Sequence, residues 1–192
     1  MPDDLPAVLS HVRWIGGGSG AAKSTVARTL ADAKGAVLYD TDAVMRDHAD
    51  RCPRDQCPKL ASFIDMTMDE RWVRRTPEQM LEMFHWFAGE GFDLIVEDLL
   101  ALPRDRLVIA EGFRLLPRLV APLLGDTRHA LWLLPTPAFR RRAFDARGTS
   151  HNGQATRTSH LQIFWRATRS LRTTCAARLP PWGYTHCRST AR

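Results

Sequence analysis

The feature that most constrains the fold of this chain is a glycine-rich turn near its N-terminus, within residues 14–25. An apolar run over residues 12–15 predicts a strand, and a helical pattern begins at Lys23. Between the two the sequence is G-G-G-S-G-A-A, and Lys23 is followed by Ser24 and Thr25. A strand, a tight turn and a helix in direct succession predict an α/β architecture with the turn at the carboxyl end of the first strand.

The composition of this turn is typical of a loop that binds phosphate groups. Counted from Gly17, the turn follows the pattern G-x-x-x-x-G-K-[ST], except that Ala22 occupies the position of the last glycine. Glycines can adopt positive φ and bring successive backbone N–H groups close to an anion. If Ala22 must adopt positive φ, the strain costs about 1 kcal/mol or more. A flexible turn without a ligand is the alternative interpretation.

We therefore predict a site for ATP and Mg²⁺ at this turn. The loop amides and the N-terminus of the helix would bind phosphate oxygens, Lys23 would add a full positive charge, and the Ser24 hydroxyl would bind Mg²⁺. The predicted nucleotide-binding residues are Gly17, Gly18, Ser19, Gly20, Ala21, Ala22, Lys23, Ser24 and Thr25.

Acidic residues follow two further apolar runs that we predict as buried strands. Residues 36–39 are followed by Asp40 and Asp42, and residues 107–110 are followed by Glu111. Ligands of open α/β sheets bind beyond the carboxyl ends of the strands, so we expect these carboxylates to lie near the glycine-rich turn. They could bind Mg²⁺ or accept a proton from a substrate hydroxyl. The alternative for each is a cap on the following helix.

A fourth apolar run, residues 130–134, is followed by a helical pattern with four arginines within residues 139–147. Arginine matches phosphate oxygens bidentately, so this helix could form a lid over a transferring phosphoryl group. At 3.6 residues per turn the four cannot all face one site, and we expect one or two to act. The predicted catalytic residues are Lys23, Asp40, Asp42, Glu111, Arg142 and Arg147, and the predicted Mg²⁺ ligands are Ser24, Asp40 and Glu111.

The segments between these strands carry helical patterns over residues 61–73, 92–102 and 115–124. Residues 80–87 are dense in methionine and aromatic side chains, which predicts a buried helix or a helix that covers a pocket. Cys52 and Cys57 do not have the usual spacing of a zinc pair, and we expect free thiols. Neither a secretory signal nor a membrane-spanning run is recognisable, so we expect a cytoplasmic protein without a membrane partner.

The net charge of +6 conceals two different parts of the 192-residue chain. All 21 acidic residues lie at or before Asp145, and the chain up to that point carries a net charge of −2. Residues 146–192 contain eight arginines and no acid. We therefore predict one α/β domain over residues 1–147 and a basic segment over residues 148–192. That segment is either a genuine extension or the product of a frame change in the coding sequence.

A basic tail could bind nucleic acid, but no DNA-reading signature accompanies it, and we do not expect a nucleic-acid partner. The expected partners are ATP and a small-molecule acceptor, and a homodimer is left open.

Taken in order, residues 17–25, Asp40, Asp42, Glu111 and the arginines of residues 139–147 resemble the P-loop kinases of small molecules. This broad group includes shikimate, gluconate, nucleoside and adenylate kinases and antibiotic phosphotransferases. The resemblance covers about residues 10–147 and implies a three-layer α/β sandwich with a mainly parallel sheet.

The resemblance also implies transfer of the ATP γ-phosphoryl group to a hydroxyl or phosphate of a small molecule. In that family an acid after the second strand handles the substrate hydroxyl, which here corresponds to Asp40 or Asp42. The alternative is a P-loop NTPase that hydrolyses or senses nucleotide and acts through a partner.

Overall fold

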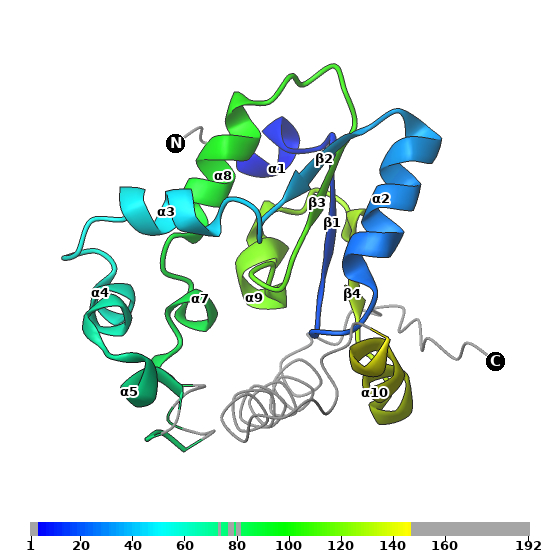
Figure 1. Cartoon of the computed structure of the whole chain (residues 1–192). Coiled ribbons are helices and arrows are strands. Elements are labelled where there is room, and N and C mark those ends of the chain that lie inside the picture. Colours follow the sequence, from blue (N-terminus) through cyan, green and yellow to red (C-terminus); the bar gives the residue numbers. More distant parts are fainter. Residues whose placement is uncertain (1–3, 73, 77–78, 80–81, 147–192) are drawn as a thin grey trace.

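The computed structural model describes residues 4–72, 74–76, 79 and 82–146, and its centre is a four-stranded parallel sheet (Figure 1). All three pairings between neighbouring strands are parallel, and the strand order is β2-β3-β1-β4. The four strands predicted from the sequence are confirmed. They are β1 (Val12–Gly17), β2 (Val37–Asp40), β3 (Val108–Glu111) and β4 (Ala130–Leu133).

The register of the strands brings their carboxyl ends to one edge of the sheet. Glu111 pairs with Asp40 of β2 on one side and with Ile15 of β1 on the other. All four residues of β3 are buried, which is typical of a central parallel strand covered on both faces. The acidic ends of β2 and β3 therefore lie beside the start of the glycine-rich turn.

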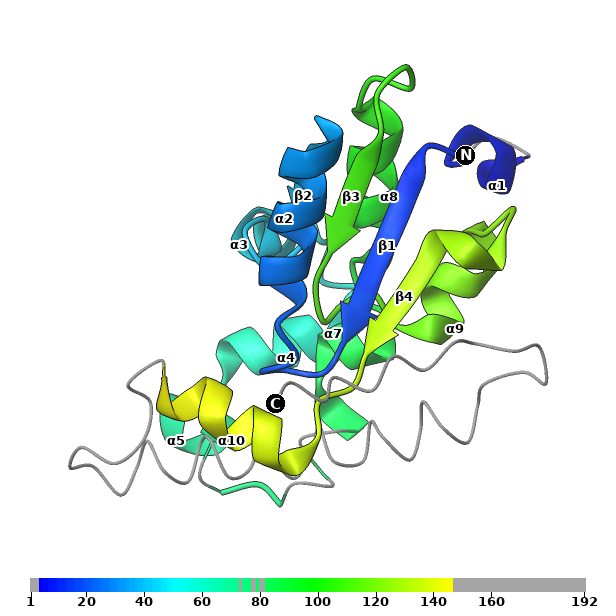
Figure 2. The same ribbon diagram turned by 90° about the vertical axis from the view of Figure 1, so that its right-hand side faces the viewer.

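Helices cover both faces of the sheet (Figures 1 and 2). On one face α2 (Lys23–Lys34) packs Ala27 and Ala31 against Ile15 and Ile109. The other face carries a larger core that includes Trp14 and the buried side of α8. The helices on that face are α1 (Leu5–Val8), α8 (Phe92–Ala101) and α9 (Pro117–Val120). The predicted α/β fold with a parallel sheet is thus confirmed.

Three helical predictions differ from the structure. Residues 61–73 form not one helix but parts of two, α4 (Pro58–Asp65) and α5 (Met68–Trp72), because Met66 is extended. Residues 115–124 are helical only from Pro117, because a residue before proline disfavours the α conformation, and a 3₁₀ turn at Ala121–Leu123 follows α9.

The apolar segment over residues 80–87 is also interrupted. Phe84 is extended, and a short helix, α7 (His85–Ala88), starts after it. Residues 80 and 81 lie outside the described part of the chain, as does the segment 148–192. The helical patterns that follow β2 and β4 are confirmed as α3 (Met45–Arg51) and α10 (Pro137–Asp145).

Cys52 and Cys57 form a disulfide between the end of α3 and the start of α4. The expectation of free thiols is therefore wrong for this pair. The reason lies in the intervening turn, where the Cys57 N–H donates to the Pro53 carbonyl at 2.8 Å and brings the two cysteines together.

Within the described ranges, no helix has the length and apolar character needed to cross a bilayer.

Ala22 is the only non-glycine residue with positive φ in the described part of the chain, at 62°. We expect Ala22→Gly to raise the free energy of unfolding by up to about 1 kcal/mol, because glycine adopts this conformation without strain. Urea denaturation measures the change. The matched control is Ala33→Gly at an exposed position of α2, which should lower stability by about 0.5–1 kcal/mol. A destabilising effect of Ala22→Gly would contradict the strain at this position.

Candidate functional site

The glycine-rich turn connects β1 to α2 through three residues with positive φ. These are Gly17 at 124°, Gly20 at 74° and Ala22 at 62°. Gly17 is required for a second reason, since a Cβ atom there would collide with the Leu133 carbonyl of the neighbouring strand. The loop therefore curls tightly against β4 and directs the N-terminus of α2 toward the carboxyl edge of the sheet. The expectation of strain at Ala22 is confirmed.

Lys23 lies in the first turn of α2 and is 9% exposed. Its Nζ donates a hydrogen bond to the Gly18 carbonyl at 3.1 Å, so the side chain folds back across the loop. This position places a nearly buried positive charge within the turn, where an anion bound by the loop amides would meet it.

The three predicted carboxylates gather at this edge but differ in their surroundings. Asp40 accepts hydrogen bonds at Oδ1 from the backbone N–H groups of Asp42 (2.9 Å) and Ala43 (3.3 Å). One of its oxygens therefore caps the turn after β2, whereas α3 has Val44 as its N-cap and no side-chain cap. Asp42 lies outside that cap, next to the backbone of Gly112 that follows β3.

Glu111 is 1% exposed, and its Oε2 atom has no hydrogen-bond partner among the described residues. Burial raises the pKa of Glu111, while Ser24 and the charge of Lys23 oppose the rise. Asp40 and Asp42 reinforce it by charge repulsion. These effects on the pKa of Glu111 show that the structure brings five predicted residues together in one cluster: Lys23, Ser24, Asp40, Asp42 and Glu111.

The pKa of Asp42 is also raised, although the side chain lies at an exposed position. Desolvation on its inner side is the main cause, Lys23 lowers the pKa, and Asp40 raises it. A carboxylate with a raised pKa accepts a proton more readily, which suits a general base.

The described residues contain no group of three or more histidine, cysteine, aspartate or glutamate side chains arranged to bind a metal ion. Mg²⁺ in phosphate-binding sites commonly uses one or two carboxylates and the phosphates of the substrate, so a smaller set is sufficient. The orphaned Oε2 of Glu111, close to Ser24, fits such a site. Asp40 retains one oxygen outside its cap.

Of the two arginines predicted to be catalytic, the structure describes Arg142, which is not part of this cluster. Arg142 is exposed on α10, and no hydrogen bond or ion pair joins it to the site residues that the structure describes. Arg147 lies outside the described residues. The helix begins close to the loop, because Pro135 lies just before α10 and faces Gly18. A role for these arginines stays a prediction.

A buried polar network behind the carboxylates escaped sequence analysis. Its centre is Arg114, which is 2% exposed and donates to His48 Nδ1 at 2.9 Å. The same guanidinium donates to the Gly91 carbonyl (2.9 Å) and the Thr41 carbonyl (3.4 Å), and it stacks on the Trp86 ring at 4.0 Å. Arg114 therefore connects the turn that carries Asp42 to α3, α7 and α8.

His48 extends this network to the surface of α8. Since arginine can only donate, His48 Nδ1 accepts and Nε2 carries the proton that is donated to Asp98 at 2.7 Å. Burial lowers the pKa of His48, so the ring is neutral near pH 7. Tyr39 at the end of β2 also donates to Asp98, at 2.7 Å. Residue spacing does not predict these contacts, because the partners are 50 to 66 residues apart in sequence.

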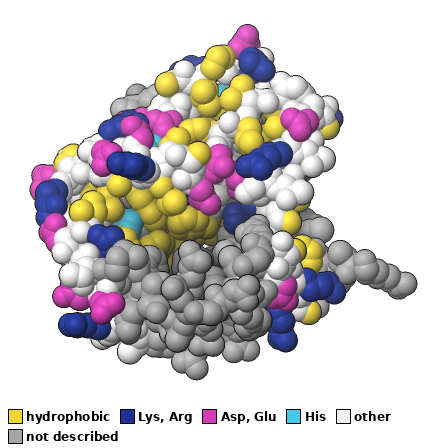
Figure 3. Space-filling model, in the orientation of Figure 1, with side chains coloured by type: hydrophobic (Ala, Val, Ile, Leu, Met, Phe, Trp, Pro, Cys, Tyr) yellow, Lys and Arg dark blue, Asp and Glu magenta, His cyan; other side chains and the backbone are white. Residues whose placement is uncertain are grey.

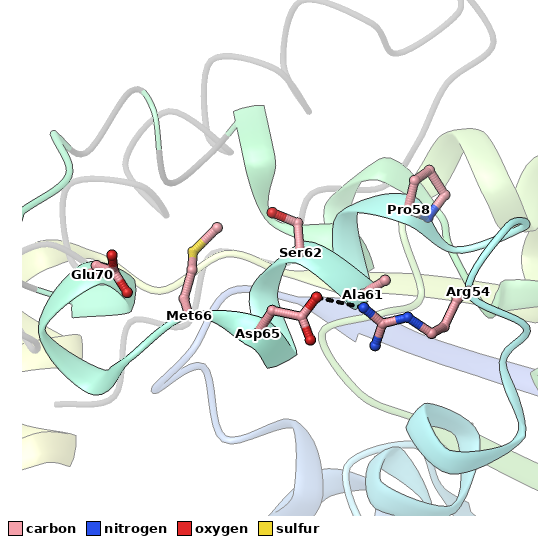
Figure 4. Close-up of a pocket in the computed structure, with 7 residues that line it drawn as sticks. All are labelled: Arg54, Pro58, Ala61, Ser62, Asp65, Met66 and Glu70. Carbon is pink, nitrogen blue, oxygen red and sulfur yellow. Dashed lines mark hydrogen bonds and ion pairs between the residues drawn. The ribbon is translucent and has the colours of Figure 1, made fainter.

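Two surface pockets lie away from the carboxylate cluster. One, of about 570 Å³, is bordered by α4 and α5, and Figure 4 shows the Arg54–Asp65 ion pair within it. The other, of about 470 Å³, lies beside the disulfide. The charges of Arg54 and Asp65 compensate each other at exposed positions.

Comparison with known proteins finds no family model and no curated protein that matches this chain.

The aromatic ring of His85 gives a test of the packing beside the site. Burial lowers its pKa to about 4, so the unfolded chain binds more protons than the folded one between about pH 6.5 and 4. Stability is therefore lost as the pH falls through this window, by about 2 kcal/mol between pH 7 and 5 from this group. Urea denaturation at the two pH values should show this loss reduced in His85→Phe. Phe87→Leu, a neighbouring non-titrating control, should keep it, and an unchanged loss in His85→Phe would contradict the assignment.

Proposed function

We propose that this protein is an ATP-dependent phosphotransferase that moves the γ-phosphoryl group to a hydroxyl or phosphate of a small molecule. The observation that carries the proposal is the meeting of a nearly buried lysine, a positive-φ loop and three carboxylates at one edge of a parallel sheet. The first two suit the phosphates of a nucleotide. The carboxylates suit a cation and an acceptor proton.

The residues of the chain divide this work between them. The loop amides and the N-terminus of α2 bind the phosphates, and Lys23 balances the negative charge that develops on them. Ser24 and Glu111, with Asp40, would hold Mg²⁺, which supplies further charge neutralisation when bound. Asp42 orients the acceptor, because its carboxylate is not engaged in the cap formed by Asp40. Arginines of α10 would complete the site on closure.

In the proposed transfer the acceptor oxygen forms a bond to the γ-phosphorus as the bond between that phosphorus and the leaving oxygen of ADP breaks. The acceptor proton passes to the Asp42 carboxylate. Arg114 holds the turn that carries Asp42 through the Thr41 carbonyl, so it positions the base without touching the substrate.

An ATP-using enzyme of this kind belongs in the cytoplasm. The Cys52–Cys57 disulfide would be reduced there, and the proposal requires that transfer not depend on it.

Lys23→Ala should abolish turnover, because it removes the nearly buried positive charge within the loop. ADP release is measured with Mg²⁺, ATP and a panel of nucleosides, sugars and antibiotics as acceptors. Lys34→Ala, at the exposed end of α2, is the matched control and should retain the wild-type rate. Turnover in Lys23→Ala would refute the phosphate-loop assignment. ADP release that needs no acceptor would favour the alternative of a hydrolysing NTPase.

Asp42→Asn should lower the rate of phosphoryl transfer by about 10²-fold or more, while ATP affinity changes less than threefold, because the amide cannot accept the proton. Single-turnover kinetics and calorimetric ATP titration measure the two quantities. Asp50→Asn on the exposed side of α3 is the control. Equal losses of rate and ATP affinity would show that Asp42 has a structural role.

A further inference from the structure

Three phenylalanine rings form a cluster beside the carboxylates, which we name the aromatic wall: Phe84, Phe87 and Phe113. The ring centroids of Phe84 and Phe87 are 5.0 Å apart, and the Phe113 ring lies 6.2 Å from Phe84 and 6.0 Å from Phe87. Each ring thus contacts the other two. Phe113 lies in the turn after β3, Phe87 lies in α7, and Phe84 is the residue before that helix.

The aromatic wall begins next to the proposed catalytic base. Phe113 is separated from Glu111 only by Gly112, and a Cβ atom placed on Gly112 would lie 3.3 Å from Asp42 Oδ1. Gly112 has a φ of 149°, so the backbone passes close to the Asp42 turn before it reaches Phe113. The backbone that leads into Phe113 therefore lies beside the Asp42 carboxylate.

The wall differs from the core beneath it. Cys57, Leu60 and Trp86 form a buried cluster, and Phe84 and Phe113 pack on it. All three rings of the wall remain half-buried, so each keeps some surface exposed. Figure 3 shows a hollow in this face over α7. The surface of the hollow is largely hydrophobic, and acidic side chains lie beside it. A half-buried set of rings in a hollow is the arrangement expected of a ligand surface rather than of a closed core.

The chemistry of this surface restricts what can bind. The rings themselves offer no hydrogen bonds, and His85, which lies 5.0 Å from Phe84, is neutral near pH 7 because burial lowers its pKa. The charge of Arg114 is directed away, toward His48 and two backbone carbonyls. A second arginine, Arg118, donates to the backbone carbonyl of Phe87. The rings themselves replace none of the hydrogen bonds that a sugar makes with water, whereas a flat apolar ring gains stacking contacts on them.

We propose that the acceptor is a hydroxyl compound with a planar, largely apolar ring, which stacks on the aromatic wall while its hydroxyl group lies at Asp42. This proposal rests on the proposed function, because it assigns the acceptor of the same site. The acceptor oxygen becomes bonded to the γ-phosphorus, ADP leaves with the electron pair of the broken bond, and the hydroxyl proton goes to Asp42.

Calorimetric titration of the full chain with three alcohols tests the wall directly. The probes are 2-naphthalenemethanol, cyclohexylmethanol, which is apolar but not planar, and glucose. We expect 2-naphthalenemethanol to bind at least tenfold more tightly than either of the others. Equal affinities, or a preference for glucose, would overturn the proposal.

Variants locate the binding within the molecule. Phe87→Leu and Phe113→Leu should each weaken binding of 2-naphthalenemethanol at least threefold and raise its KM as an acceptor. Phe92→Leu is the matched control, because Phe92 packs against the separate core on the α8 side of the sheet. If one wall variant does not fold, as judged by circular dichroism, the other still decides. Unchanged binding in a folded wall variant would overturn the proposal.

A parallel titration with Mg²⁺ and ATP separates the two proposals. If ATP does not bind, the proposed function is wrong, and the affinities for the three alcohols still decide the nature of the wall. If ATP binds and only sugars accept the phosphoryl group, the proposed function stands and the aromatic acceptor is refuted.

Discussion

The buried carboxylate of Glu111 is the constraint on which the rest of the site depends. It ends the central strand β3, fully buried, with Asp40 on one neighbouring strand and Ile15 on the other. A carboxylate in this position is costly unless cations or hydrogen-bond donors compensate it. Lys23 and Ser24 supply that compensation from the start of α2. The glycine-rich loop turns the chain so that α2 begins at this edge. It thereby places Lys23 and Ser24 beside Glu111 of the neighbouring strand β3.

Two groups of residues in the candidate site meet at Gly112. On one side are the loop, Lys23 and Glu111, which suit phosphates. On the other side are Asp42, Arg114 and the aromatic wall. The positive φ of Gly112 and the absence of a Cβ, which would collide with Thr41, allow the two groups to approach. Arg114 donates hydrogen bonds to Thr41, His48 and Gly91. These buried contacts, rather than the exposed loop around it, hold the turn that carries Asp42.

The parts of this site that could be predicted from the sequence are those formed by residues adjacent in the chain. The turn from Gly17 to Lys23 and the acids directly after β2 and β3 follow from local patterns, because parallel strands bring their carboxyl ends to one edge. The engagement of one Asp40 oxygen by two backbone N–H groups could not be predicted, because it depends on the geometry of the turn after β2. Arg114 and His48 were missed because their mutual contact joins residues 66 apart in the sequence. The breaks at Met66 and Phe84 were missed because apolar spacing alone does not reveal an extended residue within a helical pattern.

In the function that we propose, phosphorus moves from ATP to an acceptor rather than to water. Phosphorus NMR of the full chain with Mg²⁺, ATP and a mixture of alcohols follows this directly, because a phosphate ester, ADP and inorganic phosphate give separate signals. We expect an ester signal that grows in step with ADP, with little inorganic phosphate. In Lys23→Ala the ester signal should be absent. Growth of inorganic phosphate in step with ADP, or no ADP with any acceptor, would contradict the proposed function.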